Sequence, residues 1–480
     1  MTQCKDASMT DTTTAQLQHL FTVQQQAFAA DSDPSHALRM DRLARLQTLM
    51  GEHEAAFIAA IDADFGGRSH HETRMAELFV LRAGVRHAQA HLKQWMRPQR
   101  VATALHFLPG SNRLLAQPLG VVGIISPWNY PLQLALGPAL AALAAGNRVL
   151  LKPSELTPRL SGLLAELVAR YYAPEEMAVV TGDASIGQAF ASLPFDHLFF
   201  TGSTQVGRQI AQLAAANLTP VPLELGGKSP AILDPSCRLH SSLQRIAFGK
   251  LLNAGQTCVA PDYLLVPRGQ AAGVAQQLAQ AMGRLYPRLH DNPDYTAIIS
   301  PRHRARLQTL VEEARGGGAQ VIEVNPAGEE LGHSRKLAPT LILGATSSMR
   351  VMQEEIFGPV LPILEYDQAE DAIAQVRQGP RPLALYWFGE DAARREQILR
   401  QTHAGGVTIN DCLWHLVQEE QPFGGVGESG MGAYHGRWGF DTFSKRKPVF
   451  RQARFNGGTL LHPPYGKTFE WVLGLIRRLS

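Results

Sequence analysis

Short apolar runs alternate with helical segments through most of the chain, and this alternation is the strongest constraint on its fold. Residues 15–96 are expected to be mostly helical, and residues 101–116, interrupted by Pro109-Gly110-Ser111-Asn112, predict a hairpin with a turn. Between residues 118 and 223 the alanine-rich segment 132–145 is typical of a helix, and four apolar runs have the length of a buried strand: 121–126, 147–153, 177–182 and 196–202. A second alternation extends from about residue 229 to residue 410, and its strand candidates include 230–234, 262–268, 320–324, 382–388 and 405–410. Strands joined in this way by helices predict a parallel sheet, so we expect an α/β protein with two α/β domains.

The composition is that of a globular enzyme and excludes several other classes of protein. The 480 residues are 45% hydrophobic and 18% charged, and a net charge of +3 gives no reason to expect a nucleic-acid partner. The N-terminus is polar, and no run of about 18 apolar residues would form a spanning helix. The scattered cysteines, Cys4, Cys237, Cys258 and Cys412, argue against a zinc site or a disulfide framework. We therefore expect a cytoplasmic protein without a transmembrane anchor or a bound metal.

Three polar residues lie in settings that favour catalysis, although each also has an ordinary structural interpretation. Cys258 follows Gly255-Gln256-Thr257, where backbone and polar groups would surround a reactive thiolate, but a lone cysteine is more often a small buried side chain. Glu224 stands between two leucines, either as a partly desolvated base or as the partner of Lys228. Asn129, in Pro-Trp-Asn-Tyr-Pro, is either a turn residue or a donor to an oxyanion.

The segment 201–207 joins a predicted strand to a predicted helix. It reads Thr-Gly-Ser-Thr-Gln-Val-Gly, and the N–H groups at a helix N-terminus can bind phosphate. Arg208 and Gln209 stand where a Walker A loop requires lysine followed by serine or threonine, and no predicted strand is followed by a Gly-x-Gly-x-x-Gly fingerprint. From these residues alone, a turn without a ligand is as well supported as a phosphate site.

Seven segments together resemble the aldehyde dehydrogenase superfamily, from about residue 20 to residue 455, and they occur in the family's order. One such motif is weak evidence, whereas seven in order are not expected by chance. The interval of 34 residues (258 − 224) between Glu224 and Cys258 is also typical of the family. The residues around Cys258, with Ile409-Asn410-Asp411 and 430–436, are similar to the class 3 branch and to its coniferyl aldehyde dehydrogenases. The segments are PWNYP (127–131), KPSELTP (152–158), FTGSTQVG (200–207), LELGGKSP (223–230), GQTCVAPDY (255–263), EEIFGPVLP (354–362) and PFGGVGESGMG (422–432).

The resemblance implies roles for individual residues. Cys258 would be the nucleophile, Glu224 the general base of deacylation, and Asn129 the oxyanion donor together with the Cys258 N–H. An aldehyde would be the substrate and NAD the cofactor, with NADP as an alternative. Tyr130, Leu134 and Phe423 would line the aldehyde tunnel. The implied cofactor-binding residues are Lys152 and Glu155 at the adenosine ribose, Gly202, Ser203 and Gly207 in and after the turn at the pyrophosphate, and Glu355 and Phe357 at the nicotinamide ribose and ring.

The family's organisation implies domain boundaries and an assembly. A bridging β element would pair two subunits, so we expect a homodimer. The implied units are a flexible tail (1–14), a cofactor-binding domain (15–100 and 118–223), a catalytic domain (224–427), the bridging element (101–117 and 443–455) and a C-terminal tail (456–480).

Two other functions remain open at this point. An acylating dehydrogenase would pass the thioester to coenzyme A, but the presence of Glu224 disfavours it because hydrolysis needs a base. A non-catalytic relative is disfavoured by the intact set of Asn129, Glu224, Cys258 and Glu355. An aromatic lining would favour aldehydes of the coniferyl type, and its candidates are Tyr130, Trp414, His415 and Phe423.

Overall fold

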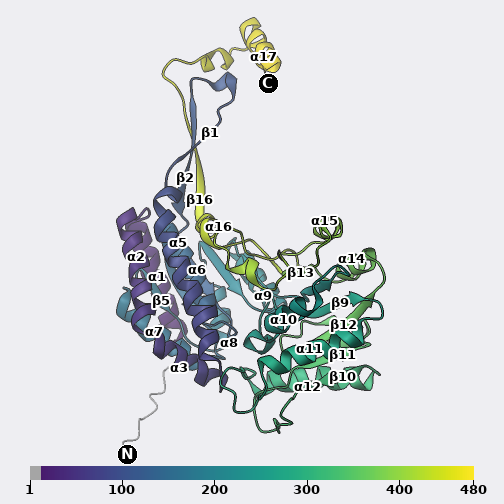
Figure 1. Ribbon diagram of the computed structural model, residues 1–480. Helices are drawn as coiled ribbons and strands as arrows, with labels where there is room; N and C mark the ends of the chain where they lie inside the picture. Colours follow the sequence, from purple (N-terminus) through teal and green to yellow (C-terminus); the bar gives the residue numbers. More distant parts are fainter. Residues whose placement is uncertain (1–11, 480) are drawn as a thin grey trace, which may run out of the picture.

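The computed structural model describes residues 12–479, which form three sheets surrounded by helices (Figure 1). Two of the sheets are mainly parallel, so the predicted α/β class is confirmed. Residues 1–11 of the predicted tail lie outside the described residues, and the first helix begins at Thr14. Residues 15–96 are mostly helical, as predicted. Their elements are α1 (Thr14–Ala30), α2 (His36–Glu52), α3 (Glu54–Phe65), α4 (His70–Thr73), a π-helical turn (Arg74–Phe79) and α5 (Val80–Trp95).

The first sheet has six strands in the order β15-β7-β6-β3-β4-β5, and all of its pairs are parallel except β15 with β7. The four predicted strands of this region are present. The strands are β3 (Val121–Ile125), β4 (Arg148–Lys152), β5 (Met177–Val179), β6 (His197–Thr201), β7 (Leu223–Glu224) and β15 (Gly430–Met431), and the helices are α6 (Gln133–Ala145), α7 (Pro158–Tyr171), α8 (Ala184–Ala191) and α9 (Thr204–Ala216). Because β15 comes from near the C-terminus, this sheet also includes residues beyond the predicted cofactor-binding domain.

Helix α6 is apolar on all sides, and the fold buries it accordingly. Every residue of the helix except Gly137 is buried, because it packs against β3 and β4 on one side and against α2 and α5 on the other. It ends at Gly146, whose φ of 95° is accessible to glycine without strain. This packing fixes the N-terminal end of α6 next to the loop that follows β3.

The second sheet has seven strands in the order β10-β11-β12-β9-β8-β13-β14, with β10 alone antiparallel to its neighbour. Strands β11 and β12 are not among the predicted ones. The strands are β8 (Pro230–Leu233), β9 (Tyr263–Pro267), β10 (Gln320–Glu323), β11 (Thr340–Leu343), β12 (Val360–Tyr366), β13 (Ala384–Phe388) and β14 (Gly406–Ile409). The helices are α10 (Leu239–Leu251), α11 (Ala271–Leu285), α12 (Pro301–Gly316), α13 (Arg350–Gln353), α14 (Ala369–Gln378) and α15 (Ala392–Gln401), with 3₁₀ turns at Leu252–Gly255 and Trp414–Val417.

The connection order of the first sheet creates a crevice. Strand β3 lies between β4, which follows it in the chain, and β6, which the chain reaches only after β5. The loops after β3 and β6 therefore leave the carboxyl edge of the sheet in different directions, and ligands commonly bind at such a switch point. These loops carry Pro127–Leu132 and Gly202–Ser203, two of the segments singled out from the sequence.

A three-stranded antiparallel sheet forms an arm that extends from the body and carries the C-terminal helix at its tip (Figure 1). The predicted hairpin is present, but Ser111 and Asn112 belong to its second strand rather than to the turn, because a 3₁₀ turn and Pro109 make the connection longer. No described helix has both the length and the apolar character needed to cross a membrane. The elements are β1 (Gln99–Val101), β2 (Ser111–Pro118), β16 (Ser444–Arg451), 3₁₀ turns at Leu105–Phe107 and Gly458–Leu461, α16 (Gly436–Thr442) and α17 (Lys467–Leu479).

Candidate active site

Two cavities of different chemical character meet at Cys258. One is lined mainly by apolar side chains and has a volume of about 140 Å³, and the other is more polar and has a volume of about 420 Å³. Cys258 and Leu134 line both of them. A thiol at such a junction is accessible to an apolar molecule from one side and to a polar one from the other.

The loop that carries Cys258 is fixed by buried hydrogen bonds of its neighbours. Gln256 is fully buried, donates to the carbonyl oxygens of Asn253 and Ala297 at 3.0 Å each, and accepts from the N–H of Ile299 at 2.9 Å. Gly255 has a φ of 75°, and a Cβ on it would lie 2.3 Å from the carbonyl oxygen of Gly358. The sequence Gly-Gln immediately before Thr257 therefore serves to place the thiol.

The surroundings of Cys258 strongly favour the protonated thiol. Burial, and after it the negative charges of Glu355 and Glu224, raise its pKa to about 12. A reactive cysteine usually has a lowered pKa, so the protein groups around Cys258 do not by themselves activate its thiol. Attack on a substrate requires that the thiol lose its proton to a base. The carboxylates of Glu355 and Glu224 are the candidate bases near it.

Glu224 is a deeply buried carboxylate at the end of β7. It is 2% exposed, and neither of its carboxylate oxygens has a hydrogen-bond partner among the described residues. Burial alone raises its pKa well above the ordinary value of 4.5. Such a group is costly to the fold and is found most often where a proton has to be moved.

The alternative that Glu224 pairs with Lys228 is wrong. The ammonium group of Lys228 instead forms an ion pair with Asp262 and donates to the carbonyl oxygens of Val351 and Glu354 at 2.8 and 3.1 Å. The strand β7 ends at Glu224, and the chain then turns through two glycines, so the two side chains are directed to different neighbours.

Asn129 is held by contacts on both its backbone and its side chain. Its carbonyl oxygen accepts from Arg68 Nη1 and from Asn253 Nδ2, both at 2.9 Å. Its own Nδ2 donates to the carbonyl oxygen of Gln256 at 3.1 Å. A side-chain amide has two N–H donors, so one of them is available to a ligand in the polar cavity that Asn129 lines.

Most of the residues that the resemblance assigns to the cofactor line the polar cavity. Gly202, Ser203, Glu355 and Phe357 all line it, together with the first residues of α9. Burial raises the pKa of Glu355 to about 8, and its Oε1 accepts from the N–H of Gly227 at 3.0 Å. A Cβ on Gly226 would lie 2.3 Å from both oxygens of Glu355, so only glycine permits this approach. His303 and Arg306 also line the cavity and were not predicted from the sequence.

Three of the assigned positions lie outside the cavity lining. Lys152 is the last residue of β4, which pairs with β3, and Glu155 follows the strand; Lys152 Nζ lies 3.7 Å from Glu155 Oε2. Gly207 lies within α9, and a Cβ there would come 2.7 Å from Leu225 Cδ2. Gly207 therefore permits close packing of α9 against the chain beyond β7, and the turn before the helix is nearer to the cavity.

The apolar cavity contains all three positions assigned to the aldehyde tunnel, Tyr130, Leu134 and Phe423, and also Trp414. His415 is not among its lining residues and bonds through Nδ1 to the Thr408 hydroxyl at 2.8 Å. Phe79, Phe248, Tyr434 and His435 line the cavity without having been predicted, because apolar residues give no sign in sequence of facing a cavity rather than the core.

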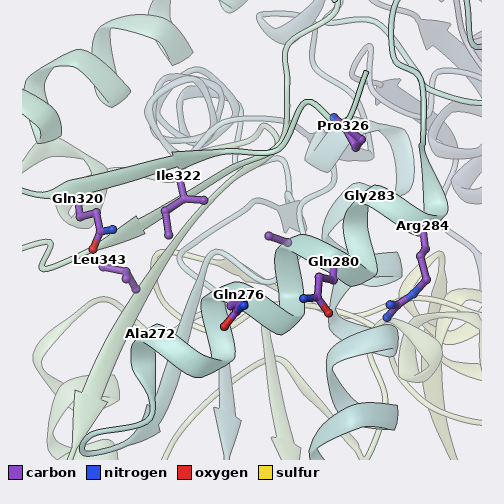
Figure 2. Close-up of a pocket in the computed structure, with 10 residues that line it drawn as sticks. Ala272, Gln276, Gln280, Gly283, Arg284, Gln320, Ile322, Pro326 and Leu343 are labelled. Atoms are coloured by element: carbon purple, nitrogen blue, oxygen red, sulfur yellow. The ribbon is translucent and has the colours of Figure 1, made fainter. Parts of the chain in front are cut away.

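A separate open groove lies between α11 and the edge of the second sheet (Figure 2). It is lined by small and apolar side chains and by glutamines, and Arg284 is its only ionisable lining residue. It lacks a nucleophile and an acid–base pair among its lining residues, so the chemistry points to the cavities at Cys258.

Comparison with known proteins places the chain among close relatives. Residues 1–449 match the model of the aldehyde dehydrogenase family. A probable coniferyl aldehyde dehydrogenase of Pseudomonas aeruginosa is 50% identical over 455 residues, which cover 95% of each chain. A coniferyl aldehyde dehydrogenase of a Pseudomonas species is 47% identical over 443 residues, 92% of each chain. A solved structure described as the substrate-bound state of Staphylococcus aureus AldH has a TM-score of 0.90 and 36% identity, covering 96% of this chain and 99% of that one. The resemblance predicted from the seven segments is confirmed.

The unpartnered carboxylate of Glu224 predicts a stability gain on its removal. A carboxyl group whose pKa is raised in the folded state stabilises the fold below its unfolded pKa and loses that contribution as pH rises through the folded pKa. Glu224→Gln should therefore raise the apparent Tm at pH 8 by roughly 2–4 °C, the shift that about 1 kcal/mol gives in a domain of this size. The gain should shrink at pH 5, and the exposed control Glu312→Gln should show neither effect. A lower Tm at pH 8 for Glu224→Gln would contradict the prediction.

Proposed function

The chain belongs to the aldehyde dehydrogenase family, and from this premise we propose that it oxidises an aromatic, coniferyl-type aldehyde to its carboxylic acid with NAD, through a thioester on Cys258. The observation that carries the proposal is the junction at Cys258, where an apolar cavity and a polar one meet beside the unpartnered carboxylate of Glu224. An aldehyde and a dinucleotide would each reach the same sulfur from its own side.

The first step is addition of the Cys258 sulfur to the aldehyde carbon. The thiol has to lose its proton on attack, since its pKa lies near 12, and Glu224 is a base that lines the same cavity. The carbonyl oxygen takes up the negative charge as the carbon–sulfur bond forms. The second N–H of the Asn129 amide and the backbone N–H of Cys258 would donate to that oxygen.

Hydrolysis of the thioester is the task we assign to Glu224. The carboxylate would accept a proton from a water molecule as the water attacks the acyl carbon, and the Cys258 thiolate would then leave. A raised pKa makes Glu224 a stronger base than an ordinary glutamate. The absence of a hydrogen-bond partner among the described residues leaves both oxygens available to the water.

The polar cavity is suited to a dinucleotide. The turn Gly202–Ser203 and the N-terminus of α9 would hold the pyrophosphate, and Glu355 would accept from the nicotinamide ribose. Gly226 leaves open the space in which the carboxylate of Glu355 lies. When bound, the nicotinamide supplies the hydride acceptor of the oxidation. Phe357, whose ring centroid lies 5.4 Å from that of Trp128, would limit the space beside the nicotinamide.

The choice between NAD and NADP would be made at the end of β4. The side chain of Glu155 is 49% exposed and lies 3.7 Å from the ammonium group of Lys152. Its carboxylate can accept from the hydroxyl groups of an adenosine ribose, whereas it would repel a 2′-phosphate. We therefore expect NAD to be preferred, with NADP used less well.

The substrate class follows from the lining of the apolar cavity. Tyr130, Phe423 and Trp414 were expected there, and Phe79, Phe248 and Tyr434 add further rings. Aromatic pairs gain about 0.5–1.5 kcal/mol beyond the burial of apolar area, so such a lining favours an aromatic aldehyde over an aliphatic one.

The homodimer remains a prediction, for which the arm gives physical support. Leu105, Phe107 and Phe450 are 47–59% exposed on it, and a second copy would bury them. The domain boundaries expected from the family likewise remain a proposal.

The first prediction concerns the nucleophile. Cys258→Ala should abolish aldehyde oxidation, because the variant lacks the thiol that forms the thioester, while NAD binding should persist. Among the described cysteines only Cys258 lines either cavity, so Cys237→Ala is the matched control. Steady-state NADH formation and NAD titration measure the two properties. Substantial oxidation by Cys258→Ala would refute the mechanism.

The second prediction separates hydrolysis from the other functions. In Glu224→Gln the thiol can still attack, so rapid mixing should give a burst of close to one NADH per active site. Turnover should then slow by about 10²–10⁴-fold, the usual worth of a general base, with an acyl group on Cys258 by mass spectrometry. A smaller or slower burst would show that Glu224 also takes the thiol proton. Normal turnover would remove Glu224 from the mechanism, and product that requires coenzyme A would support acyl transfer.

The third prediction concerns specificity. Aromatic aldehydes of the cinnamyl type should have a higher kcat/KM than medium-chain aliphatic ones, and NAD a higher kcat/KM than NADP. A panel of both aldehyde classes with each cofactor, followed at the NADH absorbance band, tests both statements. Glu155→Gln should narrow the preference for NAD. A strong preference for NADP, or for aliphatic aldehydes, would overturn the corresponding assignment.

A further inference from the structure

A cluster of potential metal ligands lies outside the two cavities. His87 and His91 are one helical turn apart on α5, and the loop that follows the 3₁₀ turn Trp414–Val417 brings Glu420 next to them. One ligand atom of each residue lies within 4.8 Å of those of the other two. His87 Nε2 is 3.5 Å from Glu420 Oε1. The scattered cysteines led us to expect no bound metal, whereas none of these three residues is a cysteine.

The hydrogen bond of His91 fixes which of its nitrogens is available. Its Nδ1 lies 2.8 Å from the carbonyl oxygen of His87, an acceptor, so Nδ1 carries the proton and donates. In the neutral ring the lone pair is then on Nε2. A histidine oriented by an Nδ1–H bond to a carbonyl is the usual arrangement of a metal ligand, because the bond sets the tautomer and the direction of the ring.

The surrounding residues leave space at His87 and restrict the neighbouring ring. Gly436 has a φ of 44°, and a Cβ on it would lie 3.2 Å from His87 Nε2. The ring of His91 stacks on Trp95, with centroids 5.9 Å apart, which restricts its movement.

We propose that His87, His91 and Glu420 bind one divalent transition-metal ion of the zinc type. Two imidazole nitrogens and one carboxylate oxygen are the donors that zinc accepts, and water would complete a tetrahedral shell. Calcium and magnesium are disfavoured because they prefer sites made of oxygen ligands. The side chain of Glu420 is 76% exposed, so its carboxylate can turn toward an ion held by the two rings.

The ion would connect helix α5 to the loop that contains Glu420, which leads to the wall of the apolar cavity. Glu420 lies between the turn Trp414–Val417 and Phe423, and both contribute to the lining of that cavity. Helix α5 contributes Val80 to the same lining. Metal binding would restrain the loop from outside the cavity without touching the reacting atoms, and it is independent of the proposed reaction.

The test is a calorimetric titration of untagged protein with zinc chloride alone. The titration is done in the Cys258→Ser variant as well as in the unaltered chain, so that binding to the thiol is recognised. We expect one equivalent to bind in both proteins. His87→Ala and His91→Ala should each weaken binding by at least about tenfold, and Glu420→Gln should weaken it to a smaller extent. The matched control is His70→Ala, which removes an exposed histidine that has a carboxylate partner, Asp62, and lies outside the cluster of His87, His91 and Glu420.

A second readout excludes a general effect of the substitutions on the fold. Cobalt(II) in the same site should give the visible absorption of a tetrahedral ion, and the spectrum should disappear in His91→Ala while the circular dichroism of that variant is unchanged. Binding that is lost in Cys258→Ser but kept in His91→Ala would place the zinc at the thiol and overturn the proposal. Equal binding by His70→Ala, His87→Ala and His91→Ala, or no binding by the unaltered chain, would also overturn it.

Discussion

The buried side chain of Arg68 holds the candidate site together. It forms a fully buried ion pair with Glu77 at 3.1 Å, and it donates to the carbonyl oxygen of Asn129 at 2.9 Å. The other oxygen of Glu77 accepts from the N–H groups of Leu132 and Gln133, at the start of α6. Removal of either partner from such a pair is costly, by about 3–5 kcal/mol, because it leaves an uncompensated buried charge. The loop after β3 is therefore fixed by residues that do not line the polar cavity.

Two buried carboxylates of this region, Glu77 and Glu224, differ in whether they have hydrogen-bond partners. Glu77 has an arginine and two backbone donors, and it serves the structure. Glu224 has no hydrogen-bond partner among the described residues, and its ionised form is disfavoured by burial. A buried polar group without a hydrogen-bond partner is destabilising, so its presence calls for an explanation such as a role in catalysis. The contrast within one site is the physical reason for assigning proton transfer to Glu224 and positioning to Glu77.

The sequence predicts the parts of this protein whose local pattern agrees with their final environment. Strand β3 and helix α6 are almost entirely apolar, and nearly all of their residues are buried, so composition is sufficient to identify them. Strand β12 is not predicted from the sequence, because it contains Pro362 and proline is usually confined to the edge strands of a sheet. In the structure, β12 lies between β9 and β11. The motifs identify Cys258, whereas Arg68 lies in no motif.

The residues that line the cavities are not predicted from the sequence for a different reason: they are brought together by contacts between distant segments. Phe79 comes from a π-helical turn and Tyr434 from a segment near the C-terminus, and both resemble ordinary core residues in sequence. The pairing of Lys228 with Asp262 is equally invisible, because Glu224 is the nearer carboxylate along the chain. Sequence spacing predicts neighbours only within one element, and here the partners are brought together by the meeting of two sheets.

Backbone strain shows that the geometry of the site depends on packing between segments that are distant in the sequence. Seven described residues other than glycine have positive φ values, and five of them lie in the Cys258 loop or in the lining of a cavity: Asn253, Ala254, Phe357, Leu413 and His435. Each costs on the order of 1–3 kcal/mol and persists only where surrounding contacts impose it. Among these five, only Asn253 and His435 are of residue types that adopt positive φ with some frequency. The positions of the thiol and of both cavity walls are therefore set by tertiary packing against local preference, so the site should lose its geometry before the sheets lose theirs.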